Sequence, residues 1–84
     1  MLVQFSAEWC GPCSAIEGNM DDFNAKYADK IEFRYLDADA FEDLFAELEI
    51  ANMPTFRVYK TDGTHKEMYG TKLDKIEAFI TSSI

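Results

Sequence analysis

The sequence predicts one α/β domain, spanning residues 1–84, in which helices cover both faces of a four-stranded mixed sheet. Three observations predict it. The chain has 84 residues, which is room for a single hydrophobic core. Strand-like and helix-like segments follow one another in the order β-α-β-α-β-β-α. A right-handed crossover makes the first two strands parallel, and a hairpin adds two antiparallel ones.

The first strand and the first helix come from the N-terminal third of the chain. Residues 2–5, Leu-Val-Gln-Phe, form the short apolar run of a strand that is buried on both faces. A helix is then expected from just after Cys10 to about residue 28, with Pro12 in its first turn, where a missing N–H is harmless. Its apolar stripe consists of Ile16, Met20, Phe23 and Tyr27. Gly18 interrupts this stripe and weakens the helix by up to ~1 kcal/mol relative to Ala.

The middle of the chain predicts a second strand and a second helix. Apolar and polar residues alternate over residues 31–35, which is the pattern of a strand. Asp39, with Glu42 three residues later, resembles a capping box and is expected to begin the helix. The apolar residues of that helix are Phe41, Leu44, Phe45 and Leu48.

The C-terminal third predicts a hairpin and a last helix. Residues 55–59 and 64–69 flank Asp62-Gly63, a strong hairpin signal. Thr71, with Asp74 three residues on, is expected to start the final helix. The apolar face of this helix consists of Leu73, Ile76, Phe79 and Ile80.

The charge balance excludes several classes of partner. The chain has 16 Asp and Glu against 8 Lys and Arg, a formal net charge of −8, so it lacks the basic patch of a nucleic-acid binder. Residues 37–49 carry only acidic charges, which indicates either a surface that steers basic partners or a solvated helix face. No apolar run approaches ~18 residues, and residues 1–5 lack a signal-peptide pattern. We expect a cytoplasmic monomer with no membrane or nucleic-acid partner.

The only two cysteines, Cys10 and Cys13, form one CxxC. A disulfide between them would close a loop that is too small to stabilise the fold appreciably. A closed zinc site needs four ligands, and the single histidine, His65, is far away in the sequence, so no metal is expected. The pair therefore favours redox chemistry.

Two separate motifs resemble those of one protein family. Residues 5–13, Phe-Ser-Ala-Glu-Trp-Cys-Gly-Pro-Cys, resemble the active-site signature of the thioredoxins, and residues 53–56, Met-Pro-Thr-Phe, resemble their cis-proline segment. Gly63 and Gly70 fall where the family keeps glycines. The resemblance covers the whole chain, and it implies a minimal thioredoxin fold that lacks the usual N-terminal strand and helix.

The resemblance implies a protein-disulfide reductase. Cys10 is the expected nucleophile, because a position just before a helix favours the thiolate, and Cys13 is the expected resolving thiol. Gly11 and Pro12 set the geometry of the pair. The expected partners are protein disulfide substrates and a thioredoxin reductase that passes on electrons from NADPH. No bound cofactor is expected beyond the redox-active disulfide Cys10–Cys13.

A substrate groove is also implied. Pro54 is expected to follow a cis peptide bond, which would leave the Met53 backbone free to pair with an extended client segment. Trp9, Met53 and Gly70 would form a partly apolar lip around Cys10.

Two positions depart from the family. Gln4 stands where the family has a buried Asp, and Tyr35 where many members have a Lys. A glutamine amide cannot accept a proton near neutral pH, so deprotonation of Cys13 must rely on another group or on water. This substitution keeps open a redox-regulated binding module with little turnover. A disulfide isomerase or oxidase is disfavoured by Pro12, and a cluster carrier bridged between two CxxC copies is a further alternative.

Overall fold

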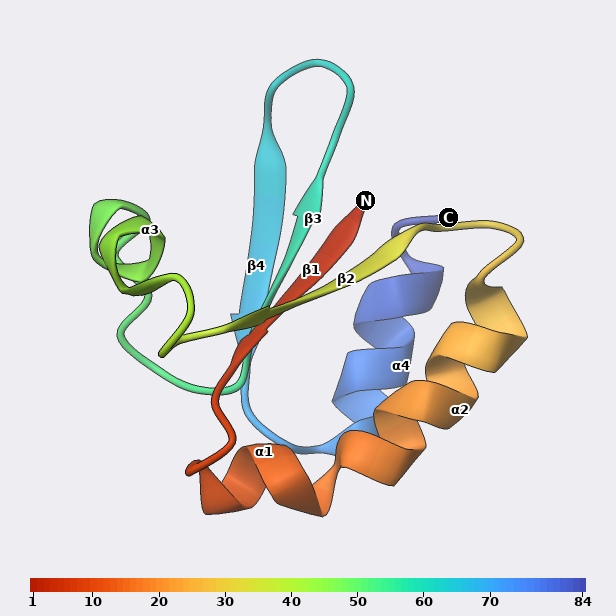
Figure 1. The fold of residues 1–84 in the computed structure, drawn as a ribbon. Helices are drawn as coiled ribbons and strands as arrows, with labels where there is room; N and C mark the ends of the chain where they lie inside the picture. Colours follow the sequence, from red (N-terminus) through yellow and green to blue (C-terminus); the bar gives the residue numbers. More distant parts are fainter.

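The computed structural model describes residues 1–84 and has the expected order of elements, except that two helices stand where the first helix was predicted. The elements are β1 (Leu2–Ser6), α1 (Gly11–Ala15), α2 (Glu17–Tyr27), β2 (Phe33–Asp37), α3 (Glu42–Glu47), β3 (Thr55–Tyr59), β4 (His65–Tyr69) and α4 (Leu73–Thr81). The strands lie in the order β2-β1-β3-β4, with β1 parallel to β2, and with β3 antiparallel to both β1 and β4 (Figure 1). All of the helices are too short or too polar to span a lipid bilayer.

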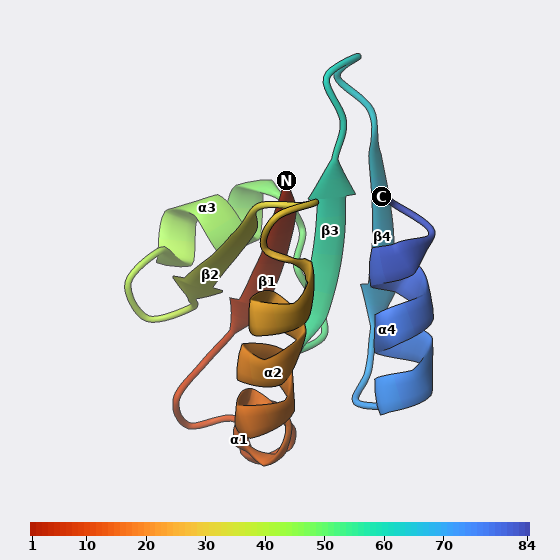
Figure 2. The same cartoon turned by 90° about the vertical axis from the view of Figure 1, so that its right-hand side faces the viewer.

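Helices cover both faces of the sheet, as predicted. Helix α3 lies on one side, and α2 and α4 lie side by side on the other (Figures 1 and 2). Every residue of β1 is buried, because this central strand is covered on both faces. Successive side chains of β1 face opposite sides of the sheet. Leu2 packs in the core between the sheet and helices α2 and α4. Phe5 packs on the other side, edge-on against Phe45 of α3, with 5.3 Å between the ring centroids.

The first predicted helix is broken in two, which corrects the expectation of one continuous helix. The break falls at Ile16, whose φ of −106° and ψ of 2° are not helical. Its N–H bonds to the Cys13 carbonyl at 3.3 Å, closing a tight turn at the end of α1. Gly18 lies inside α2 and is not the point of interruption. Ile16 is buried in the main core, so its packing there overrides the continuous helical pattern of the sequence.

The capping box predicted at Asp39 is wrong. Helix α3 begins at Glu42 after Phe41, and no side chain caps it. Asp39 lies two residues before the N-cap position, and its carboxylate instead accepts a hydrogen bond from the Trp9 indole, 3.2 Å away. The turn before α3 is held by Asp37, whose carboxylate accepts the Asp39 N–H at 3.1 Å.

Two other boundaries also shift. Helix α4 follows Lys72 and not Thr71, and it too lacks a side-chain cap. Strand β2 begins at Phe33, two residues later than expected, because the Ile31 N–H bonds back to the Tyr27 carbonyl at 3.0 Å in the turn that ends α2.

The predicted hairpin is confirmed, with a three-residue loop. The Lys60 N–H bonds to the Thr64 carbonyl at 2.9 Å, and Gly63 takes a φ of +91°, which side chains with a Cβ rarely adopt. The Asp62 carboxylate accepts both the N–H and the hydroxyl of Thr64, at 3.0 and 2.6 Å. The turn is therefore fixed by the residues that predicted it.

Candidate active site

The two cysteines lie at the start of α1, beside the end of β1. Cys10 occupies the N-cap in extended conformation, and its sulfur accepts the Cys13 N–H at 3.4 Å. The Cys10 thiol lies 3.8 Å from the Met53 carbonyl oxygen, to which it donates. Both residues are free thiols; Cys13 is 4% exposed and Cys10 is 8% exposed. Cys13 is thus the more enclosed of the two.

The surroundings of Cys13 favour its neutral form. Burial is the main cause that raises the pKa of the Cys13 thiol, and a hydrogen bond with the Cys10 side chain raises it further. Hydrogen bonds with the Ala7 backbone and the Ser6 side chain act in the opposite direction and lower this pKa. The raised pKa favours the thiol form of Cys13 in the reduced protein.

The Met53–Pro54 peptide bond is cis, as the sequence resemblance implied. Met53 packs against the small cluster formed by Ala7, Cys10 and Cys13. The Pro54 carbonyl accepts the Gly70 N–H at 3.1 Å, and Gly70 has a φ of +118°. The structure therefore brings Met53 to the thiols and links Gly70 to the same segment.

Trp9 directly precedes Cys10 in the chain and is 63% exposed. Two carboxylates, one on the last residue of β2 and one just after the strand, hold this loop: Asp37 accepts the Glu8 N–H at 3.3 Å, and Asp39 accepts the Trp9 indole N–H. Parallel strands end at the same edge, and Ser6 pairs with Asp37 there, so this contact could have been inferred from the strand order. Sequence reasoning missed both aspartates, and also Tyr69, an exposed aromatic beside Gly70.

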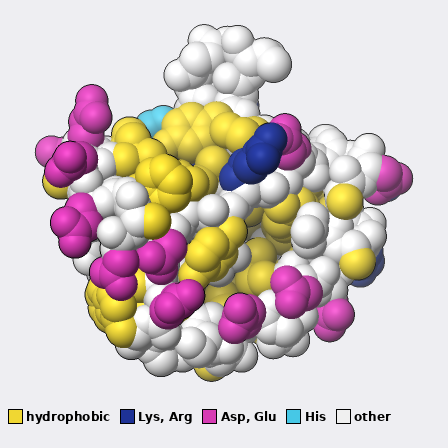
Figure 3. All heavy atoms as spheres, in the orientation of Figure 1, with side chains coloured by type: hydrophobic (Ala, Val, Ile, Leu, Met, Phe, Trp, Pro, Cys, Tyr) yellow, Lys and Arg dark blue, Asp and Glu magenta, His cyan; other side chains and the backbone are white.

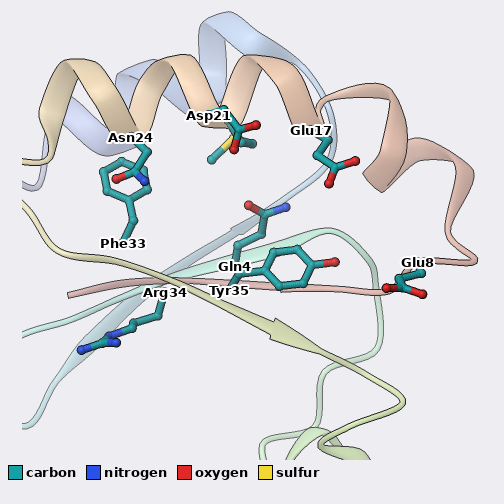
Figure 4. A pocket seen from close by; sticks show the side chains of 9 residues that line it. Gln4, Glu8, Glu17, Asp21, Asn24, Phe33, Arg34 and Tyr35 are labelled. Carbon is teal, nitrogen blue, oxygen red and sulfur yellow. The ribbon is translucent and has the colours of Figure 1, made fainter.

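Gln4 and Tyr35, the two positions that depart from the family, lie close to Cys13 in the structure. The three residues line a cavity of about 270 Å³, whose other lining residues are Ala7, Glu8, Ser14 and Glu17. A second hollow of about 320 Å³ lies between α2 and β2, and Gln4 and Tyr35 point into it (Figure 4). Burial, followed by the charge of Asp37, raises the pKa of Tyr35.

Gln4 is a buried amide with a partner. Its Nε2 donates to the Ser6 hydroxyl oxygen at 3.0 Å, and Ser6 is itself fully buried. Sequence reasoning did not single out Ser6. The signal that was present is spacing: Gln4 and Ser6 are two polar residues on one face of an otherwise apolar strand, just before the cysteines.

No group of three or more His, Cys, Asp or Glu side chains that could hold a metal ion occurs in the structure. The chemistry available is that of the two thiols. A four-stranded mixed sheet that places a CxxC pair at a helix start, beside a cis-proline segment, defines a thiol-disulfide oxidoreductase. The family model described as Thioredoxin matches residues 1–82. The chain belongs to the thioredoxin family.

Individual relatives agree with this assignment. The chain is 36% identical over 84 residues to the thioredoxin of Homo sapiens, covering 100% of this chain and 79% of that protein. It is 35% identical over 85 residues to the thioredoxin of Coprinus comatus, covering 100% of this chain and 80% of that one. The chain therefore spans about four-fifths of the length of these two relatives.

Solved structures give the same result. The thioredoxin NaTrxh of Nicotiana alata is 35% identical with a TM-score of 0.88, over 98% of this chain and 70% of that one. A Plasmodium falciparum thioredoxin is 30% identical with a TM-score of 0.91, over 99% of this chain and 80% of that one. A further structure concerns the thiol resolving mechanism of a yeast mitochondrial 1-Cys peroxiredoxin via glutathione/thioredoxin systems. It is 29% identical with a TM-score of 0.86, and the match covers 96% of this chain and 76% of that one.

Proposed function

We propose that this protein is a protein-disulfide reductase in which Cys10 attacks and Cys13 resolves. One observation carries the proposal: Cys10 is at the N-cap of α1 with its sulfur already accepting an N–H, while Cys13 is held behind it as a thiol. Gly11 and Pro12 lie between them in the first turn of the helix and keep the two sulfurs on one side of it.

The reaction has two exchange steps. The Cys10 thiolate attacks one sulfur of a client disulfide, the client S–S bond breaks, and the other client sulfur leaves as a thiolate that takes up a proton. Cys13 then loses its proton and attacks the Cys10 sulfur, which releases the second client sulfur. The Cys10–Cys13 disulfide forms, and two electrons have passed to the client.

The order of the steps follows from the environment of the two sulfurs. The Cys13 N–H stabilises negative charge on Cys10, whereas burial and the Cys10 side chain raise the pKa of Cys13. Once Cys10 is bonded to a client sulfur, it no longer carries a charge or a thiol hydrogen, so its contribution to the raised pKa of Cys13 disappears. Cys13 becomes easier to ionise after the first attack, when it is needed.

The client is proposed to bind as an extended segment across the cis-proline loop. The Met53 carbonyl already accepts a hydrogen bond from Cys10, so it is positioned to pair with a client backbone N–H. Pro54 and Gly70 shape this part of the groove, and the exposed ring of Trp9 supplies an apolar rim.

The oxidised pair has to be reduced again for turnover. We propose that a thioredoxin reductase does this with electrons from NADPH, since the chain holds no redox cofactor binding motif of its own and its relatives include proteins of thioredoxin systems. A monomer in the cytoplasm is part of the proposal, and cell fractionation with native mass measurement tests both points.

Insulin reduction tests the function. The protein should accelerate insulin precipitation by dithiothreitol, and it should also reduce insulin with NADPH and a thioredoxin reductase. The Cys10→Ser variant is the control and should be inactive in both assays. Absence of acceleration by the intact protein would favour the alternative that the buried amide of Gln4 supports, a redox-regulated binding module with little turnover.

A further inference from the structure

Arg57, in the middle of β3, carries a charge that the fold encloses. Its side chain is 10% exposed, and its guanidinium carbon lies 5.8 Å from the centre of the Phe5 ring, on the side of the sheet that α3 covers. A buried charge is costly unless polar groups surround it. The guanidinium donates to three acceptors, which are the Glu67 carboxylate at 2.6 Å, the Leu48 carbonyl at 2.8 Å and the Tyr59 hydroxyl at 3.2 Å. These bonds link β3 to β4 and to the end of α3.

The Leu48 carbonyl lies where α3 turns into residues 49–54, the connecting segment between this helix and β3. The N–H groups of the two residues after Leu48 bond back to carbonyls of α3 at 3.2 and 3.0 Å, which is the pattern of a Schellman turn. Such a turn needs a residue in the left-handed conformation, and glycine usually supplies it. Here Glu49 has a φ of +57°, which a side chain with a Cβ disfavours. The residue at position 49 therefore does not favour the turn by itself, and Arg57 anchors the turn from outside.

The connecting segment carries the carbonyl that is proposed to bind the client. Met53 packs against the cluster that contains Cys10, and its carbonyl oxygen lies 3.8 Å from the Cys10 sulfur. One end of the segment is held at Pro54, whose carbonyl accepts the Gly70 N–H at 3.1 Å. The other end adjoins the anchored Leu48 carbonyl, which is only five residues before Met53. A shift of the turn at Leu48 is therefore passed on to the Met53 carbonyl.

We propose that Arg57 is a positioning residue for client binding: it holds the Leu48 carbonyl and thereby keeps the connecting segment in the form that presents the Met53 backbone to an extended client. The inference rests on the proposed function, in which a peptide client pairs with Met53. Such a client binds only molecules whose connecting segment is ordered, so its apparent affinity scales with the fraction of those molecules. Arg57 raises this fraction before the client arrives, without taking part in either exchange step.

Replacement of Arg57 should separate peptide clients from small disulfides. Arg57→Met keeps an unbranched side chain in the same place and removes all three hydrogen bonds. The prereduced protein is mixed with increasing concentrations of a disulfide-bridged peptide, quenched with acid and analysed by mass spectrometry, which yields a half-saturating concentration and a limiting rate. The half-saturating concentration should rise about tenfold with little change in the limiting rate, because only binding depends on the ordered segment. Hydroxyethyl disulfide has no backbone N–H with which to pair, so its rate should stay within about twofold of the wild type.

Three further variants isolate the anchoring role of Arg57. Arg34→Met removes an exposed arginine of β2 and is the matched control, which should change neither measurement. Arg57→Lys keeps the charge, but a single ammonium cannot reproduce the fork of the guanidinium, so the half-saturating concentration should rise about threefold. Adding Glu49→Gly to Arg57→Met should recover most of the loss, because glycine adopts the left-handed conformation without an anchor.

An unchanged half-saturating concentration in Arg57→Met would overturn the proposal. Equal losses with the peptide and with hydroxyethyl disulfide would also overturn it, because they indicate a general loss of the fold, and so would failure of Glu49→Gly to recover peptide binding. If Arg57→Met does not fold, an Arg57→Lys variant with the kinetics of the wild type has the same force. A wild type that reacts with hydroxyethyl disulfide but with no peptide disulfide would instead contradict the proposed function alone.

Discussion

At the scale of single residues, Cys13 determines how the rate should depend on pH. Burial raises the pKa of Cys13, and this effect persists when Cys10 is bonded to a client, so the Cys13 thiolate is scarce at neutral pH and increases as the pH rises. We expect the resolution of a preformed mixed disulfide to accelerate through the neutral and mildly alkaline range, up to about tenfold per pH unit, and to level off once Cys13 is ionised. Stopped-flow measurement of client release checks this. A rate independent of pH would show that Cys13 ionisation does not limit the step.

Trp9 should report the redox state of the pair. It is the only tryptophan, it precedes Cys10, and its indole is tied to Asp39. Disulfides quench a nearby indole, so emission should be brighter in the reduced protein than in the oxidised protein. A Cys10→Ser/Cys13→Ser variant should show no change with redox conditions. Identical spectra for both states of the intact protein would place the ring away from the reacting sulfurs.

The site was only partly predictable from the sequence, and the reason differs from residue to residue. Cys10, Cys13 and Pro54 belong to motifs with a fixed spacing, so their positions followed from the resemblance. Asp39 was misassigned, because the helix begins two residues later than the local pattern indicates and the carboxylate bonds to the distant Trp9 instead. Ser6 carries no local signal beyond its alternation with Gln4, and its hydrogen bond with that residue is seen only in the structure.

At the scale of the elements, α2 contains a glycine that the fold does not require. A Cβ built on Gly18 meets nothing within 4 Å, and its backbone is helical without a positive φ. Gly18→Ala should therefore raise the free energy of unfolding by about 0.5–1 kcal/mol. Urea denaturation followed by far-UV circular dichroism measures it.

Gly63 is the matched control for this prediction. It also has open space around it, but its φ is +91°, so Gly63→Ala should lower the free energy of unfolding by about 1 kcal/mol. If Gly18→Ala destabilised the protein as much as Gly63→Ala, the bend at Ile16 would depend on the freedom of Gly18, contrary to our account of the break.

The elements themselves were more predictable than their ends. The two strand-like segments on either side of Asp62-Gly63 identified β3, β4 and their turn, because this local pattern is typical of a hairpin and of no other structure. The break at Ile16 was not predictable, since it depends on where Ile16 packs in the core. The starts of α3 and α4 shifted because neither helix has a side-chain cap.

At the scale of the whole molecule, acidic charge dominates the surface. The net charge is −8, and Figure 3 shows many Asp and Glu side chains and few Lys or Arg on one face. The carboxylates of Asp37 and Asp39 accept hydrogen bonds from the loop that carries Trp9, and Glu8 lies on that loop, so the negative potential extends to the reactive edge.

This charge should select among clients by their association rate. Reduction of a peptide disulfide flanked by lysines should slow by about threefold or more between low salt and about 0.5 M salt, because screening weakens the attraction. A peptide flanked by glutamates should show the opposite trend, and a neutral peptide should change little. Equal salt dependence for the three peptides, measured as kcat/KM, would mean that residues 37–49 are only a solvated surface.

The measurement that tests the central claim most directly is the capture of the mixed disulfide. Incubated with an oxidised client and analysed by intact-protein mass spectrometry, Cys13→Ser should accumulate a covalent 1:1 adduct that dithiothreitol releases, because Cys10 attacks and nothing resolves it. Cys10→Ser should form none, and the wild type should pass directly to the Cys10–Cys13 disulfide. An adduct that accumulates on Cys10→Ser, with normal turnover by Cys13→Ser, would contradict the roles assigned to the two sulfurs.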